Sequence, residues 1–258
     1  MSAGTWNGID LAENRRRMEA GELYTAFVPD LTAERRVAAQ ACGVYNREAT
    51  EVTRRQQVEM LRKIVPSLPE LPPAKATEAE DEAQLYDYPW CEPPLRVDYC
   101  DRISSVSFRL RDSPFVELTF DPGRFGKNVF CNFNFTVLNT TQVTIGSRVL
   151  FGPNVSLFSG THPLDPAIRN GTRGPEMGGR ITIGDDCWFG GSVCVLPGVT
   201  IGRGVTVGAG SVVAKNVPPF VVVAGNPARI LRKVESDLAI EYFKEHPEEE
   251  YFPPTQTK

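Results

Sequence analysis

Apolar residues recur every six positions through much of the second half of the chain, and glycine directly follows most of them. The recurring positions are Ile145, Phe151, Leu157, Ile183, Phe189, Val195, Ile201, Val207 and Val213. A six-residue period fits neither a lone helix nor a hairpin, and it is typical of a parallel β-helix built from stacked short strands. We therefore expect each hexad to place one apolar side chain in the core and a glycine at the bend between strands.

The period is interrupted between Thr161 and Arg180, where proline, asparagine and glycine replace the hexads. Repeat proteins accommodate insertions as loops on one face, and that face often binds ligands. His162, one of only two histidines in the chain, stands at the start of this segment. We therefore take 161–180 as a candidate catalytic loop within a β-helix that spans 122–233.

The chain before the repeats divides into three segments. Residues 10–65 show helical spacing of apolar residues, and we expect Pro29 to end one helix and Thr32 to cap the next. Residues 66–100 are rich in proline, glutamate and alanine, which predicts a linker or an extended wrap. Residues 101–121 alternate in a pattern that predicts an inserted two-stranded hairpin.

After the repeats, residues 234–258 predict a short helix from Ser236 to about Glu245 and then a polar tail. Such a helix would cap the open end of the coils, which solenoids require. The predicted fold class is therefore mostly β, a parallel β-helix with a helical N-terminal segment and a short C-terminal helix.

Composition excludes several classes of protein. The formal net charge is −4, and no basic stripe with interleaved aromatic residues is present, which argues against nucleic acid as a partner. No apolar run approaches about 18 residues and no signal-peptide pattern occurs, so we expect a soluble, cytoplasmic protein without membrane association. The six cysteines form no C-x-x-C pair, and with two histidines this predicts reduced, mostly buried thiols and no metal site.

Several short motifs match one known family in their order and spacing. They are Gly21-Glu22-Leu23-Tyr24, Asn132-Phe133, Thr161-His162-Pro163, Trp188-Phe189-Gly190-Gly191 and Ala224-Gly225-Asn226-Pro227-Ala228-Arg229. From about residue 12 to 233 the chain resembles the maltose/galactoside O-acetyltransferase family of hexapeptide-repeat acyltransferases. The resemblance implies a left-handed β-helix, a homotrimer with active sites between subunits, acetyl-CoA as co-substrate, and a sugar or another small polyol as acceptor.

Direct transfer of an acetyl group to a hydroxyl requires a general base with a pKa near that of free imidazole, about 6.5. His162 is the candidate for this base, because His246 lies in a charged tail segment. The resemblance implies that Glu176 orients the imidazole and that Asn132 contacts the acceptor beside it. The alternatives are an ordinary surface carboxylate for Glu176 and a corner asparagine of the β-helix for Asn132.

The resemblance also assigns binding residues. Those expected to bind acetyl-CoA are Trp188, Gly190, Gly191, Ala209, Ala214, Lys215, Arg229 and Arg232. Those expected to bind the acceptor are Asp98, Asn132, Asn139 and Met177. Gly191 replaces a serine of some relatives, so a backbone N–H alone would serve the thioester oxygen. Asn139 and Thr140 stand where close relatives have an acidic residue, which alters part of the acceptor contact.

Two other functions fit the same hexads. One is an O-acetyltransferase of this fold with a xenobiotic or secondary metabolite as acceptor, although the streptogramin and chloramphenicol type lacks the helical N-terminus. The other is a non-catalytic hexapeptide-repeat scaffold, which would lose the histidine and the cationic residues. A γ-class carbonic anhydrase needs three histidines on zinc, and the two histidines of this chain exclude it.

Overall fold

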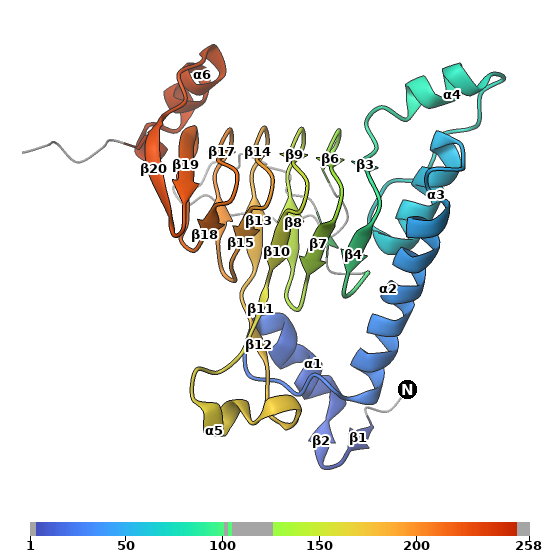
Figure 1. The fold of residues 1–258 in the computed structure, drawn as a ribbon, viewed down its shortest axis with the longest axis vertical. Helices are drawn as coiled ribbons and strands as arrows, with labels where there is room; N and C mark the ends of the chain where they lie inside the picture. The colour runs from blue at the N-terminus through green and yellow to red at the C-terminus, as the bar shows by residue number, and fades with distance from the viewer. Residues whose placement is uncertain (1–3, 101–102, 105–125, 252–258) are drawn as a thin grey trace, which may run out of the picture.

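The computed structural model describes residues 4–100, 103–104 and 126–251, and its centre is a coil of short parallel strands (Figure 1). Sheet I contains β3 (Trp90–Cys91), β6 (Phe130–Cys131), β9 (Leu150–Phe151), β14 (Trp188–Phe189), β17 (Thr206–Val207), β19 (Val221–Gly225) and β20 (Ala228–Lys233). Sheet II contains β4 (Leu95–Val97), β7 (Phe135–Leu138), β10 (Ser156–Phe158), β15 (Cys194–Val195) and β18 (Val212–Val213). Sheet III contains β5 (Ile103–Ser104), β8 (Val143–Ile145), β13 (Ile181–Ile183) and β16 (Thr200–Ile201).

The chain visits sheets I, II and III in rotation, so each circuit adds one strand to every face of a three-sided coil. We call the turns between sheet I and sheet II strands the I–II edge, and those between sheet II and sheet III strands the II–III edge. Within sheets I, II and III all strands pair in parallel except β20, which runs antiparallel to β19 and follows the last coil. The predicted parallel β-helix is confirmed by this pairing.

The hexad residues form the interior of the coil. Every position of the six-residue period is at most 1% exposed. Phe151 stacks between Phe135 and Phe189, with ring centroids 4.6 and 4.8 Å apart. Full burial of such a side chain contributes roughly 1.5–3 kcal/mol, so the repeated apolar position accounts for much of the stability of the coil.

The glycines of the hexads serve close stacking of successive coils. A Cβ atom on Gly190 would lie 2.6 Å from the backbone nitrogen of Ala209. The bends, which we expected at these glycines, have their positive φ angles a few residues later, as at Asn134 (61°), Asn154 (59°) and Asp186 (62°). Asparagine and aspartate adopt the left-handed region more readily than other residues with a side chain, so they can form the bend while glycine allows the contact.

The N-terminal segment contains the hairpin of β1 (Thr5–Trp6) and β2 (Ile9–Asp10) and the helices α1 (Leu11–Ala20), α2 (Pro29–Glu48) and α3 (Arg54–Ile64). The prediction that Pro29 ends a helix and that Thr32 caps the next is wrong. Pro29 is the first residue of α2, because the first turn of a helix needs no N–H donor there.

The range 66–100, predicted as a linker or wrap, ends in the first coil. It contains α4 (Glu78–Gln84) and the strands β3 and β4, which pair in parallel with β6 and β7. Trp90 N donates to Val129 O at 2.8 Å, so this segment is joined to the repeats by backbone hydrogen bonds. The predicted hairpin at 101–121 lies outside the described residues except for β5, which pairs in parallel with β8.

The C-terminal helix lies at the far end of the coil, beside β19 and β20 (Figure 1). The prediction of a helix from Ser236 is confirmed by α6 (Asp237–Glu245), with the Ser236 hydroxyl accepting from Ala239 N at 3.1 Å, and η2 (Pro247–Glu249) follows. Phe220 of the last coil contacts the rings of Tyr242 and Phe243.

Within the described ranges, no helix combines the length and apolar character needed to cross a bilayer. All six cysteines are free and four are buried, as predicted.

Candidate active site

The insertion predicted at 161–180 leaves the coil at the II–III edge on a two-stranded stem. The stem is the antiparallel pair of β11 (Gly160–Thr161) and β12 (Met177–Gly178), and the projecting part holds α5 (Pro166–Arg169) and η1 (Gly171–Arg173). Figure 1 shows this projection beside α1. His162 follows β11 directly, is exposed, and has no hydrogen-bond partner among the described residues. Its imidazole is therefore open to a ligand.

The register of the stem relates His162 to Glu176. Gly160 pairs with Gly178 and Thr161 with Met177. Continued by one position, the same register sets His162 opposite Glu176 at the end of the ribbon. The predicted base and its predicted carboxylate partner thus flank the point where the stem opens into the loop.

A third strand-like segment holds Glu176 from its other side. Tyr24 N donates to Glu176 O and Glu176 N donates to Tyr24 O, each at 2.9 Å. The Tyr24 hydroxyl also donates to Glu176 Oε2 at 2.9 Å. The N-terminal segment after α1 is therefore joined to the catalytic loop by both backbone and side-chain hydrogen bonds.

The stem lies tightly against the coil. A Cβ on Gly178 would lie 2.5 Å from Thr141 Cγ2, and a Cβ on Gly160 would lie 2.6 Å from Thr140 Oγ1. Glycine is needed at both positions because any side chain would lift the ribbon from these threonines. The position of His162 is thus set by contacts at the base of the stem.

Asp98 and Asn139 occupy the same II–III edge, two coils and one coil before the loop, respectively. Asp98 is half-buried, and this burial raises the pKa of its carboxyl; the charge of Glu176 raises it further while Arg35 opposes both. Asn139 is fully buried, and its amide accepts from Tyr99 N at 2.9 Å and donates to Tyr99 O. The expectation that Asn139 contacts the acceptor does not fit this geometry, because both of its amide groups hold the backbone beside Asp98.

Other predicted residues lie on the I–II edge of the same chain. Asn132 follows β6, Gly190 and Gly191 follow β14, and Ala209 follows β17. The carboxamide oxygen of Asn132 accepts from Phe133 N at 2.8 Å, while its Nδ2 finds no acceptor among the described residues. The corner ladder of asparagines is formed instead by Asn134 and Asn154, which are bonded at 3.0 Å. Asn132 is therefore not a member of that ladder.

The backbone at Gly190 and Gly191 offers one unused donor. Gly190 N donates to Val207 O at 2.8 Å, whereas the N–H of Gly191 has no acceptor within the described part of the chain. Gly191 is half-buried, so this donor is accessible from the edge. Trp188, the first residue of β14, is 55% exposed on the outer face of sheet I.

The predicted cations lie toward the last coils. Arg229 and Arg232 are on β20, whereas Ala214 and Lys215 follow β18 on the II–III edge. Lys215, Arg229 and Arg232 are exposed and form no ion pair with described residues. Their charges therefore remain available to an anionic ligand.

The predicted site residues thus fall into two groups within one chain. One group lies at the II–III edge and consists of Asp98, Asn139, His162, Glu176, Met177, Ala214 and Lys215. The other lies on sheet I or its II-facing edge and consists of Asn132, Trp188, Gly190, Gly191, Ala209, Arg229 and Arg232. Within a single chain the two groups are separate, because they lie at different edges of the three-sided coil.

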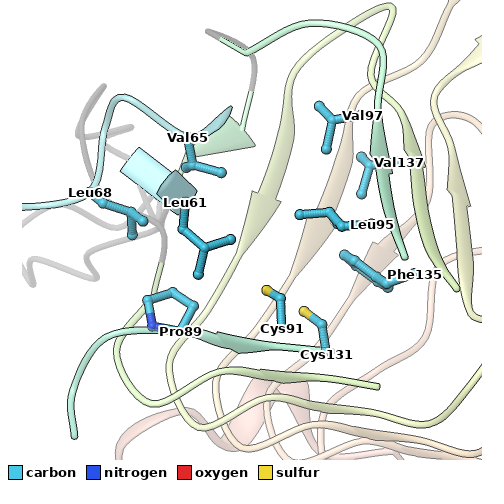
Figure 2. Close-up of a pocket in the computed structure, with 10 residues that line it drawn as sticks. All are labelled: Leu61, Val65, Leu68, Pro89, Cys91, Leu95, Val97, Cys131, Phe135 and Val137. Atoms are coloured by element: carbon cyan, nitrogen blue, oxygen red, sulfur yellow. The ribbon is translucent and has the colours of Figure 1, made fainter. Parts of the chain in front are cut away.

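A small apolar cavity elsewhere in the chain carries no chemistry. Figure 2 shows its lining, in which side chains of α3 and of the segment after it face side chains of the first coils, including Cys91 and Cys131. Its volume is about 10 Å³, at the lower limit for a single water molecule, and its walls are apolar. Among the described residues no three His, Cys, Asp or Glu side chains gather to hold a metal ion.

Sequence reasoning missed three polar residues of this region. Tyr24 entered only as part of a motif, and Arg35 and Tyr99 were not singled out. Arg35 donates to Tyr99 and, at 2.9 Å, to Ala26 O, so it joins α2 to the segment after Asp98. Only the Gly21–Tyr24 motif carried a signal for any of these contacts, since those of Tyr24 with Glu176 and of Arg35 with Tyr99 join segments far apart in the sequence.

Comparison with known proteins places the chain in a family. The maltose acetyltransferase hexapeptide capping motif matches residues 17–69, and the bacterial transferase hexapeptide of six repeats matches 180–215. A protein of Schizosaccharomyces pombe named as an acetyltransferase is 34% identical over 222 residues, covering 86% of this chain and 92% of the relative. Galactoside O-acetyltransferase of Escherichia coli is 36% identical over 157 residues, covering 61% and 66%.

Solved structures agree with this match. A maltose O-acetyltransferase from Clostridium difficile superimposes with a TM-score of 0.68 at 29% identity, covering 86% of this chain and 98% of that one. A galactoside acetyltransferase in complex with coenzyme A gives 0.66 at 27% identity, covering 94% and 97%. The chain therefore belongs to the maltose/galactoside O-acetyltransferase family of hexapeptide-repeat acyltransferases, and it is an acetyltransferase.

Proposed function

We propose that the protein transfers an acetyl group directly from acetyl-CoA to a hydroxyl of a sugar or another small polyol, with His162 as general base. The observation that carries this proposal is the stem register, which sets an exposed histidine opposite Glu176 on a loop projecting from one edge of the coil. The bound coenzyme A and acetyl-CoA of two similar solved structures support the choice of donor.

The reaction uses groups with distinct tasks. The neutral imidazole of His162 takes the hydroxyl proton while the hydroxyl oxygen attacks the thioester carbon, and Glu176 stabilises the imidazolium that forms. The N–H of Gly191 donates to the oxyanion, which would otherwise be uncompensated. Collapse of the intermediate breaks the carbon–sulfur bond, and the imidazolium returns its proton to the departing thiolate of coenzyme A.

We further propose that the coil is left-handed and that the working unit is a homotrimer. His162 lies at the II–III edge, whereas Asn132 and Gly191 lie at the I–II edge of the same chain. A complete site therefore needs the II–III edge of one subunit to lie against sheet I of its neighbour. The outer face of sheet I carries an in-register apolar ladder of Trp90, Phe130, Leu150 and Trp188. Leu150 and Trp188 are 47% and 55% exposed in the single chain, and a partner would cover them.

In this assembly the substrates lie along the interface. Lys215, Arg229 and Arg232 provide positive charge for the phosphates of coenzyme A, and Trp188, Ala209 and Ala214 line the path of its pantetheine arm. Asp98, Asn132 and Met177 face the acceptor. Asn139 acts there only through the backbone of Tyr99, which it holds in place.

The proposed function is tested by an acceptor screen that follows release of free thiol from acetyl-CoA, with maltose, galactosides and small polyols as acceptors. The enzyme should turn over at least one of them, and His162→Ala should lower kcat by roughly 10²–10⁴-fold, the usual effect of losing a general base. His246→Ala is the matched control, because that ring stacks on Tyr242 in the C-terminal cap. Turnover by His162→Ala near the wild-type rate would overturn the assignment.

A further inference from the structure

The hydroxyl of Tyr24 makes a contact that the mechanism above does not use. It donates to Glu176 Oε2 at 2.9 Å, across 152 residues of sequence, and two backbone hydrogen bonds join the same two residues. Glu176 Oε1 has no hydrogen-bond partner among the described residues. One carboxylate oxygen is thus held by Tyr24, and the other remains available to a second partner.

The segment that carries Tyr24 is itself firmly placed. The side chain of Tyr24 is only 3% exposed, and it packs with Met18, Val28 and Tyr99. Asn14 of α1 receives a hydrogen bond from Thr25 N at 2.7 Å and donates to Thr25 O at 2.9 Å. The phenol therefore approaches Glu176 from a rigid base, which is what a positioning group requires.

The chemistry of the phenol suits a permanent donor. Burial and the nearby charge of Glu176 both raise the pKa of the Tyr24 hydroxyl, with burial the larger effect. The hydroxyl therefore remains protonated across the range in which an imidazole can act as base. A protonated phenol can donate to a carboxylate but does not compete with it for the proton of an imidazolium.

We propose that Tyr24 is a positioning residue for the proton transfer, which holds the carboxylate of Glu176 toward His162 through its hydroxyl. This inference rests on the proposed function, in which His162 is the base. Its structural basis is the position of Glu176 between two neighbouring segments. Glu176 is hydrogen-bonded to Tyr24 on one side, and the stem register sets His162 opposite it on the other side. The N-terminal segment, far from the repeats in sequence, then contributes directly to the geometry of the active site.

The substitution Tyr24→Phe isolates the hydroxyl. It keeps the buried ring and both backbone hydrogen bonds to Glu176, so the loop stem stays docked. We expect kcat with acetyl-CoA and the maltose or galactoside acceptor to fall roughly tenfold to a hundredfold, the scale of a misplaced catalytic group, while KM for acetyl-CoA stays unchanged. Tyr45→Phe is the matched control, because its fully buried hydroxyl donates to Cys91 O at 2.6 Å and has no part in the site.

A double-mutant cycle separates positioning from simple stabilisation. If Tyr24 acts through Glu176, Tyr24→Phe has no further effect on kcat in a Glu176→Ala background. An equal effect in both backgrounds would overturn the proposal, as would wild-type kcat in the single variant.

A spectroscopic readout tests the same contact without any acceptor. The chain has two histidines, so NMR of the imidazole C2 protons gives two assignable signals, with His246 as an internal reference. At fixed pH, Tyr24→Phe should shift the His162 signal in the same direction as Glu176→Gln and leave the His246 signal in place. An unmoved His162 signal would contradict the inference. If His162→Ala abolishes turnover while Tyr24→Phe does not alter it, the positioning role fails and the proposed function stands.

Discussion

The side-chain amide of Asn139 is hydrogen-bonded to both backbone groups of Tyr99. It accepts from Tyr99 N at 2.9 Å and donates to Tyr99 O, and the residue is fully buried. Asn139 thereby joins the second coil to the end of β4 and sets the position of Asp98 at the II–III edge. A residue expected to touch the acceptor instead holds the backbone beside Asp98 in place.

This arrangement predicts that Asn139→Asp destabilises the fold. Aspartate keeps the acceptor for Tyr99 N but places a carboxylate against Tyr99 O, and an unsatisfied buried polar group costs about 1–3 kcal/mol, more when charged. Chemical denaturation should show a lower free energy of unfolding for this variant. The control is Asn216→Asp, where the exposed side chain only accepts from Thr200 N at 2.9 Å. Equal stability of Asn139→Asp and wild type would show that Asn139 does not stabilise the fold by holding the Tyr99 backbone.

A second prediction concerns the shared active site. His162→Ala and Asn132→Ala chains should each be nearly inactive alone, because each lacks one member of every site. If His162 and Asn132 of one site come from different chains, random 1:1 mixing after subunit exchange should restore about a quarter of wild-type activity, since three trimers in four are mixed and each has one intact site in three. Mixing either variant with itself is the control. No recovery, with exchange confirmed by mass spectrometry, would show that sites are not shared in this way.

A third prediction concerns acid stability at the corner that holds Asp186. Burial raises the pKa of this carboxyl, but hydrogen bonds from Arg148 and Arg203 outweigh burial and leave the pKa below its usual 3.8. Because the folded-state pKa is depressed, the ion cluster contributes stability above about pH 3.8 and loses it as the pH falls through the lower folded value. Asp186→Asn should therefore be less stable than wild type at pH 7, and the difference should shrink as the pH falls below 3.8.

The substitution is well suited to this test because residue 186 has φ of 62°, a value that asparagine also tolerates. Urea midpoints measured from pH 7 to about pH 3 give the comparison. Asp165→Asn serves as the control, since Asp165 caps α5 by accepting from Ala167 N, which asparagine can also do. A stability difference for Asp186→Asn that does not change with pH would rule out the ion cluster as its cause.

The sequence by itself determined the coil, its core and the loop. A residue every six positions is buried because each hexad forms one side of the three-sided coil and turns its apolar residue inward, so Ile145, Phe151 and Leu157 reveal the period locally. The loop was recognised by the loss of that period, and His162 by its chemistry and its place at the start of the loop. The start of the C-terminal helix could be predicted from Ser236, because an N-cap side chain hydrogen-bonds to the first turn of the helix that directly follows it.

Only the tertiary structure decided what joins distant segments. The contact of Tyr24 with Glu176 spans 152 residues and that of Asn139 with Tyr99 spans 40, and neither leaves a periodic trace in the sequence. The strands β3 and β4 were taken for a linker because two or three residues carry no period, and their pairing with β6 and β7 depends on coils that follow them. The separation of the predicted site residues onto two edges also follows from the winding of the chain, since an edge is defined only once three strands have closed a circuit.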